Sequence, residues 1–204
     1  MNVLHLFYYR GPKRTPFTDL HYASIVTAKE IGGFEKIIVH EDCPGDSNHY
    51  TEARKLAYVE WRKTEYNSSK DSESAIQEKR MEIVFQEGGV GADLHFIFLR
   101  SFKPLLQQCF FSKQKKKIGK ILYAPRPNIM FLNDENNALP VKTFYPVSSS
   151  NKTFLQGADI SLTESYTMYI WGNVHLKDLQ KTVIAKYLPI LSPIRYTNTT
   201  LSFN

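Results

Sequence analysis

Apolar positions in the first third of the chain fall into two short runs separated by a helical pattern. Residues 3–9 and 36–40 are largely apolar or aromatic, which predicts two buried strands. Between them, residues 17–31 place apolar side chains along one side, and Thr18 or Asp19 can cap them, so this segment predicts a helix. Strand, helix and strand in this order form a βαβ unit. We therefore predict an α/β fold with a mostly parallel sheet flanked by helices.

A second helical pattern lies at residues 75–87. Ser74 and Gln77 have the spacing of a capping box at its start, and Gly88-Gly89 stops it. Four side chains share one face of this helix: Ile76, Arg80, Ile83 and Val84. Residues 95–99 are apolar after the first position and predict a strand soon after the glycines.

The other segments carry shorter or mixed patterns. Residues 51–63 are compatible with either element, and we predict a helix. The basic run SKQKKKIGK at residues 112–120 predicts a solvated loop, with contact to anionic lipid or phosphate as the alternative. Residues 120–124 and 142–146 predict short strands, and residues 175–190 predict a helix. No internal repeat and no domain boundary is visible, so we predict a single domain.

The composition is that of a globular protein with a charge that suits phosphate. Of the 204 residues, 42% are hydrophobic and 23% are charged, which is ordinary for one domain with a core. The net charge of +6 suits a nucleotide, an anionic membrane or a nucleic acid as partner, although surplus surface lysine gives the same sum. The aromatic residues fall in apolar strands rather than among Lys and Arg, which argues against nucleic-acid binding.

Few features bear on the compartment. Cys43 and Cys109 are too few for a disulfide framework or a thiolate metal site. No apolar run is as long as a membrane span, and residues 1–10 lack the pattern of a signal peptide. We therefore expect a cytoplasmic protein, and residues 113–120 could hold it peripherally at an anionic membrane.

Candidate chemistry begins with Asp93 and His95. Side chains two apart in a strand share a face, so this carboxylate and imidazole could reach one Mn²⁺ or Mg²⁺. Waters and nucleotide phosphates would complete the shell of such an ion. The alternative is an aspartate that caps a turn beside an ordinary histidine. Arg80 lies on an apolar helix face and needs a partner, because an unpaired buried charge is costly. The backbone can turn sharply and approach a ligand closely at three glycines, Gly88, Gly89 and Gly91.

Together these residues carry a family resemblance. The segment KRMEIVFQEGGVGADLHFIFLRSFKPLL (residues 79–106) resembles the donor-binding segment of the glycosyltransferases with a DXD sugar-binding region, which include capsular polysaccharide, α-1,4-linking and mannosyl transferases. That family has Asp-x-x-Arg on a helix, a Gly-Gly turn, Tyr-x-Asp-x-Asp, an apolar strand and Lys-Pro-Leu. The spacing from Arg80 to Asp93 and on to Lys103-Pro104-Leu105 fits without a gap. The stretches VLHLFYYRG…PFTDLHYASIVTA and KTFYPVSSS…ESYTMYIWGN resemble its opening and late elements.

The resemblance implies a single-domain GT-A fold over residues 1–204. Residues 1–106 would form the nucleotide-sugar donor half, and residues 107–204 a reduced acceptor half. It implies a metal-dependent hexosyltransferase that uses Mn²⁺ (or Mg²⁺). This enzyme would move a sugar from a nucleotide-diphosphate donor, a UDP-sugar by preference, to a polysaccharide or glycolipid acceptor.

The resemblance also assigns roles to individual residues. Asp93 and Arg80 would be catalytic, and Asp93 and His95 would bind the metal. The donor would contact Leu6, Phe7, Tyr8, Gln77, Arg80, Gly88, Gly89, Gly91, Asp93, Trp171 and Asn173.

The chain departs from the family pattern at four site positions and in one length. His95 stands at the second acid of the DXD motif, Gln77 at the helix acid, Gly91 at the tyrosine and Tyr169 at the late histidine. About 39 residues separate Lys-Pro-Leu from Phe-Tyr-Pro, where the family has a longer acceptor segment. These departures keep open the alternative of a catalytically weak or inactive glycosyltransferase-like binding module.

Overall fold

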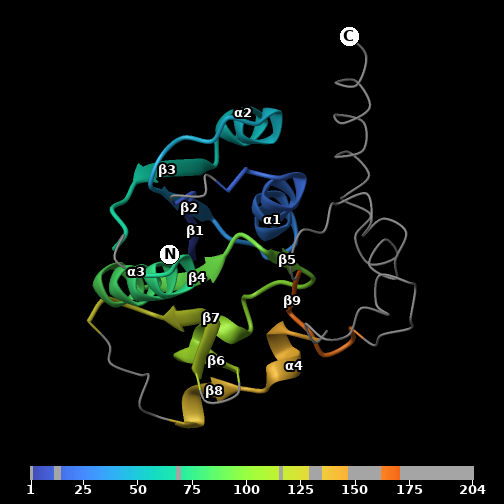
Figure 1. Cartoon of the computed structure of the whole chain (residues 1–204). Helices are drawn as coiled ribbons and strands as arrows, with labels where there is room; N and C mark the ends of the chain where they lie inside the picture. Colours follow the sequence, from blue (N-terminus) through green and yellow to red (C-terminus); the bar gives the residue numbers. More distant parts are fainter. Residues whose placement is uncertain are drawn as a thin grey trace.

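The computed structural model describes most of the first 146 residues and one later segment. The described residues are 2–11, 15–67, 70–114, 117–128, 135–146 and 162–170. Their strands form a seven-stranded sheet in the order β3-β2-β1-β4-β7-β6-β8 and a two-stranded sheet of β5 and β9 (Figure 1). The strands are β1 (Val3–Tyr8), β2 (Lys36–Glu41), β3 (Val59–Lys63), β4 (Gly89–Asp93), β5 (Phe96–Phe98), β6 (Phe110–Gln114), β7 (Lys117–Ala124), β8 (Ala138–Leu139) and β9 (Thr167–Tyr169). The helices are α1 (Asp19–Glu30), α2 (Asn48–Arg54), α3 (Ser72–Glu87) and α4 (Val141–Phe144).

The first four strands of the large sheet run parallel. β1 pairs with β2 on one side and with β4 on the other, and β3 extends the sheet beyond β2. β7 then runs antiparallel to β4, and β6 antiparallel to β7. The predicted α/β fold with a mostly parallel sheet is confirmed. The direction of strand addition reverses at β1, and this reversal positions the site described below.

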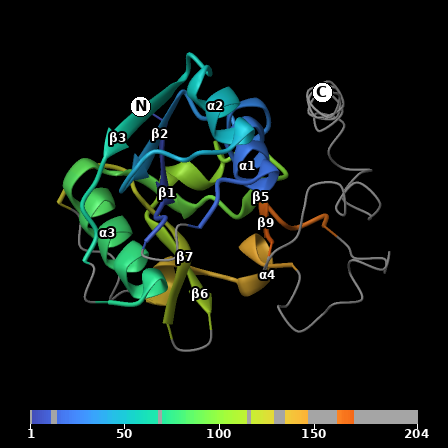
Figure 2. The same ribbon diagram turned by 45° about the horizontal axis from the view of Figure 1, so that its top comes forward.

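The helices cover opposite faces of the sheet. Figures 1 and 2 show α3 on one face, with α1 and α2 on the other. Successive side chains of β1 therefore point to opposite faces of the sheet and pack in two different layers of the core. The α1 face holds a fully buried apolar cluster that includes Leu4, Leu6, Ile25, Phe34, Ile37, Val39, Val90 and Ala92. The α3 face carries polar groups among its buried side chains: His5, His40, Arg80 and Asp93.

Two of the four predicted helices are present with revised starts. The helix predicted at 17–31 is α1, and Thr18 is its N-cap residue. The helix predicted at 75–87 is α3, which starts three residues earlier because Asp71 caps it in place of Ser74. The Asp71 carboxylate accepts a hydrogen bond from the Ser74 backbone N–H at 3.0 Å. Of the four side chains expected on one face of this helix, Arg80, Ile83 and Val84 are buried and Ile76 is half-buried.

Several other segments differ from the prediction. The helix expected over residues 51–63 is wrong in its second half, where β3 pairs with β2 as an edge of the parallel sheet. Within the basic run expected as a solvated loop, residues 112–114 belong to β6 and residues 117–120 to β7. The strand expected at 120–124 is confirmed within β7, while α4 replaces the strand expected at 142–146. The helix expected at 175–190 lies outside the described residues.

The strand β4 was missed because its sequence, GVGAD, lacks an apolar alternation. A Cβ atom at Gly91 would lie 2.7 Å from Arg80 Cγ and 2.7 Å from Val84 Cγ2. Glycine at this position therefore lets α3 pack directly on β4. Gly88 and Gly89 have φ values of 75° and 87°, so the chain leaves the helix through a conformation that favours glycine.

Candidate functional site

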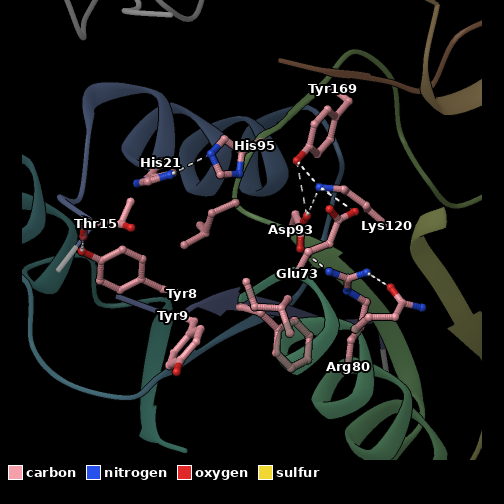
Figure 3. Close-up of a pocket in the computed structure, with 14 residues that line it drawn as sticks. Tyr8, Tyr9, Thr15, His21, Glu73, Arg80, Asp93, His95, Lys120 and Tyr169 are labelled. Atoms are coloured by element: carbon pink, nitrogen blue, oxygen red, sulfur yellow. Dashed lines mark hydrogen bonds and ion pairs between the residues drawn. The ribbon is translucent and has the colours of Figure 1, made fainter. Parts of the chain in front are cut away.

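A cavity of about 170 Å³ lies at the carboxyl ends of β1 and β4 (Figure 3). Phe7 and Tyr8 come from the end of β1, and Asp93 from the end of β4. In open parallel sheets, ligands bind outside the carboxyl ends of the strands, where the order of strand addition reverses. The position of this cavity is therefore that of a ligand site.

Arg80 and Asp93 form a buried ion pair at the base of the cavity. Arg80 is 1% exposed and Asp93 is 6% exposed. Arg80 Nη1 also donates to Gln77 Oε1 at 2.6 Å, and the guanidinium lies 5.8 Å from the centroid of the Phe7 ring. Asp93 is thus the partner that the sequence analysis required for a buried Arg80, and it holds the guanidinium in place.

Lys120, from β7, brings a second cation to the same carboxylate. Its ammonium lies 3.6 Å from Asp93 Oδ2 and 3.6 Å from Glu73 Oε1, and it donates to the Tyr169 hydroxyl oxygen at 2.8 Å. Tyr169 in turn donates to Asp93 Oδ2 at 3.5 Å. Burial, with the neighbouring Asp93 charge, raises the pKa of Tyr169 well above its usual value, so the phenol is neutral at physiological pH.

The opposite wall holds two histidines in a directed hydrogen-bond chain. The Thr18 backbone N–H donates to His21 Nδ1 at 3.1 Å, so the proton of a neutral His21 is on Nε2. That Nε2–H faces His95 Nε2 at 3.4 Å, and donation there leaves the His95 proton on Nδ1. Burial lowers the pKa of both imidazoles, for His21 well below its usual value, which favours these neutral forms.

Asp93 and His95 do not share a strand face, contrary to the sequence expectation. Asp93 is paired with Phe7 in the sheet register and therefore points to the α3 face. The chain then turns at Leu94 and His95, and the His95 ring packs against His21 of α1 with ring centroids 4.9 Å apart. The strand expected from residue 95 begins at Phe96. The assumption of one continuous strand through Asp93 and His95 was the error.

The donor atoms of Asp93 and His95 do not fit a divalent cation in this arrangement. Asp93 Oδ1 is paired with Arg80, and Oδ2 faces Lys120 and Tyr169. His95 Nε2, the ring atom next to His21, already accepts a hydrogen bond. No group of three or more His, Cys, Asp or Glu residues placed to hold a metal occurs in the part of the chain that the structure describes. The predicted metal pair is instead engaged with protein groups.

The remaining predicted donor-binding residues divide into three groups. The first group lines the cavity together with Arg80 and Asp93, and consists of Phe7, Tyr8 and Gln77. His95, predicted as a metal ligand, lines the cavity as well. Away from the cavity are Leu6, which is buried in the core, and Gly88, Gly89 and Gly91, which serve the turn and the packing of α3. Outside the described residues are Trp171 and Asn173.

Sequence reasoning assigned no site role to several residues that line the cavity. These are Tyr9, Thr15, His21, Glu73, Ile76, Leu94 and Lys120. Lys120 did carry a usable signal. It precedes Leu122 and Ala124 at alternate positions of β7, and both of those are buried against α3. A lysine in register with buried apolar residues needs a counter-charge, and this distinguishes Lys120 from the rest of the basic run.

Comparisons with known proteins add little to this geometry. No protein-family model and no curated protein matches the chain. A solved structure named PaToxG Glycosyltransferase matches with a TM-score of 0.39 and 17% sequence identity, over 62% of this chain. The chain covers 55% of the length of that structure. Similarity at this level establishes neither the fold nor the function.

No helix within the described ranges has both the length and the apolar character needed to cross a membrane.

Proposed function

We propose that this protein belongs to the class of GT-A-like glycosyltransferases and binds a nucleotide-sugar donor in the cavity at the ends of β1 and β4. The observation that carries the proposal is the pair of cations, Arg80 and Lys120, gathered around Asp93 at the reversal point of a parallel sheet. The resemblance of residues 79–106 to the donor-binding segment of this family supports the same location. The donor would be a UDP-sugar and the acceptor a saccharide or glycolipid.

Several groups that line the cavity would support such a transfer. In the reaction, the bond between the anomeric carbon and the diphosphate breaks, and its electron pair leaves with the diphosphate. A bond to the acceptor hydroxyl forms, and the departing diphosphate takes up the hydroxyl proton. Fixed cations beside the diphosphate stabilise the developing charge, and this is the role we assign to Arg80 and Lys120. Phe7, Tyr8 and Tyr9 offer aromatic surface for a base or a sugar ring.

The alternative is a binding module that holds the nucleotide without transferring the sugar. It is favoured by the full engagement of Asp93, whose two oxygens are both in contact with protein groups. Gln77 at the helix position of the family acid adds to this alternative, because an amide brings no charge.

Donor turnover tests the proposal. Wild-type protein would be incubated with UDP-glucose, UDP-galactose, UDP-N-acetylglucosamine and GDP-mannose, and released nucleotide would be measured. We expect slow hydrolysis of at least one donor, its loss in Lys120→Met and its retention in Lys55→Met. Lys55 is a matched control because it lies just after α2, outside the cavity lining, with a side chain 65% exposed.

Two other results would contradict the proposal in different ways. Binding of UDP without turnover of any donor would favour the binding module. If the protein neither binds UDP nor turns over any donor, both functions are excluded.

A further inference from the structure

Lys120 approaches the same carboxylate oxygen that a metal ion on Asp93 would need (Figure 3). Its ammonium is 3.6 Å from Asp93 Oδ2 and 4.8 Å from the centroid of the Tyr169 ring, with a side chain only 17% exposed. The other oxygen, Oδ1, is paired with the fully buried Arg80. A divalent cation placed on Asp93 would therefore lie beside two fixed positive charges, and like charges at such distances repel strongly.

The histidine wall offers a proton where metal coordination requires a lone pair. The Thr18 backbone N–H can only donate, and it fixes the direction of the chain through His21 to His95. His95 Nε2 accepts from His21, so the remaining ring atom, Nδ1, carries a hydrogen. In this state His95 can donate to an anion, and it can ligate a cation only by giving up its hydrogen bond with His21.

Glu73 completes the environment of Lys120 and is easily displaced. Its side chain is 76% exposed and its carboxylate lies 3.6 Å from the ammonium, a contact of little energetic value at a surface. A phosphate oxygen that takes the place of the Glu73 carboxylate would keep Lys120 fully paired. It would also bring the negative charge of a diphosphate next to Lys120, in a cavity that Arg80 lines as well.

We infer that the site binds the diphosphate of its donor without a divalent cation, and that Lys120 supplies the positive charge that a metal would otherwise bring. The inference rests on the proposed function, because it concerns the same donor cavity. It makes Lys120 a phosphate-contacting residue and Glu73 its counter-ion in the absence of ligand. It replaces the Mn²⁺ expected from the sequence with groups of the chain itself.

Calorimetric titration with UDP tests the inference on the full chain. Wild type, Lys120→Met, Lys120→Arg, Glu73→Gln and Lys55→Met would each be titrated in EDTA and again with Mn²⁺. We expect wild type to bind with the same affinity in both buffers. Lys120→Met would bind on the order of tenfold to a hundredfold more weakly, as for one lost charge-assisted hydrogen bond.

Two variants show that this loss reflects charge rather than misfolding. Lys120→Arg keeps the positive charge and would recover part of the affinity. Glu73→Gln removes a competing carboxylate from an exposed position and would tighten UDP binding. A purely structural role of Lys120 predicts neither the recovery nor the tightening. Lys55→Met would bind as wild type does.

The contrary results separate this inference from the proposed function. If wild type binds UDP only with Mn²⁺, the inference is wrong and the donor site stands; loss of this Mn²⁺-dependent binding in His95→Ala would then make His95 a metal ligand. If Lys120→Met binds UDP as tightly as wild type in EDTA, the assignment of Lys120 is wrong. If wild type binds no UDP in either buffer, both the inference and the proposed function fail.

Discussion

Asp93→Asn removes the counter-charge of Arg80 while keeping the shape of the side chain. Because Arg80 is 1% exposed, the variant leaves a buried guanidinium with only the amide of Gln77 among the hydrogen-bond partners that the structure describes for it. Breaking a buried ion pair in this way costs about 3–5 kcal/mol, and we expect the upper part of that range. The nearby ammonium of Lys120 adds repulsion to the unpaired cation.

The reciprocal variant, Arg80→Met, is expected to cost less, at about 3 kcal/mol. In that variant Asp93 keeps Lys120 and Tyr169 as partners, so its charge remains partly compensated. In a protein of this size, about 3–5 kcal/mol corresponds to a fall in Tm of roughly 6–20 °C. The double variant should be more stable than the sum of the single effects predicts, because it buries no unpaired charge.

Urea unfolding followed by circular dichroism measures these free energies. Lys79→Met is the control on the same helix, since its partially exposed i,i+3 pair with Glu82 should contribute less than about 0.5 kcal/mol. A loss below about 1 kcal/mol for Asp93→Asn would refute the reasoning, as would a larger loss for Arg80→Met than for Asp93→Asn.

Three further predictions concern other parts of the fold. Burial lowers the pKa of His5 to about 4 and of His40 to about 3. In the unfolded chain these histidines have a pKa of about 6.5, so below this pH the unfolded state binds more protons than the folded state. Unfolding free energy should therefore be fully maintained above pH 6.5 and fall from there toward pH 4, by about 1.4 kcal/mol per pH unit for each histidine. Urea unfolding at pH 7.5 and pH 5 checks this. The slope should be smaller in His5→Gln/His40→Gln, where buried His21 and His95 still contribute, and an undiminished slope would contradict the prediction. Gly91→Ala places a Cβ 2.7 Å from the Arg80 stem and should cost about 1–3 kcal/mol by the same assay, whereas an unchanged value would show that α3 shifts freely. If the basic run at residues 113–120 contacts anionic membranes, exchanging the lysines of residues 115–117 for glutamine should abolish co-sedimentation with phosphatidylserine vesicles, and unchanged binding would contradict that hypothesis.

The sequence pattern predicted the βαβ unit at the centre of the parallel sheet, but not the flanking parallel strands β3 and β4. β1, α1 and β2 have long apolar runs or a clear helical face, and local patterns of this kind survive into the fold. β4 was missed because its glycines serve the close approach of α3, which a local pattern does not reveal. β6 and the first residues of β7 were missed because lysines interrupt the apolar pattern of this segment, whose buried face packs against α3.

The candidate site was predictable only in part for a related reason. The need of Arg80 for a partner follows from its place on an apolar helix face, and Asp93 was already a candidate nearby in sequence. Lys120 comes from a strand that joins the sheet antiparallel to β4, so its distance from Asp93 depends on sheet order. Asp93 and His95 do not present their donor atoms to one cation in this structure, because a two-residue turn after Asp93 places the His95 ring against His21 of α1.

The most direct test of the donor site is amide hydrogen exchange with and without UDP, read by mass spectrometry. The account predicts slower exchange in peptides that cover residues 6–11 and 91–96, which contain the ends of β1 and β4, and no change in α2. Protection elsewhere with these two segments unchanged would contradict the assignment of the cavity.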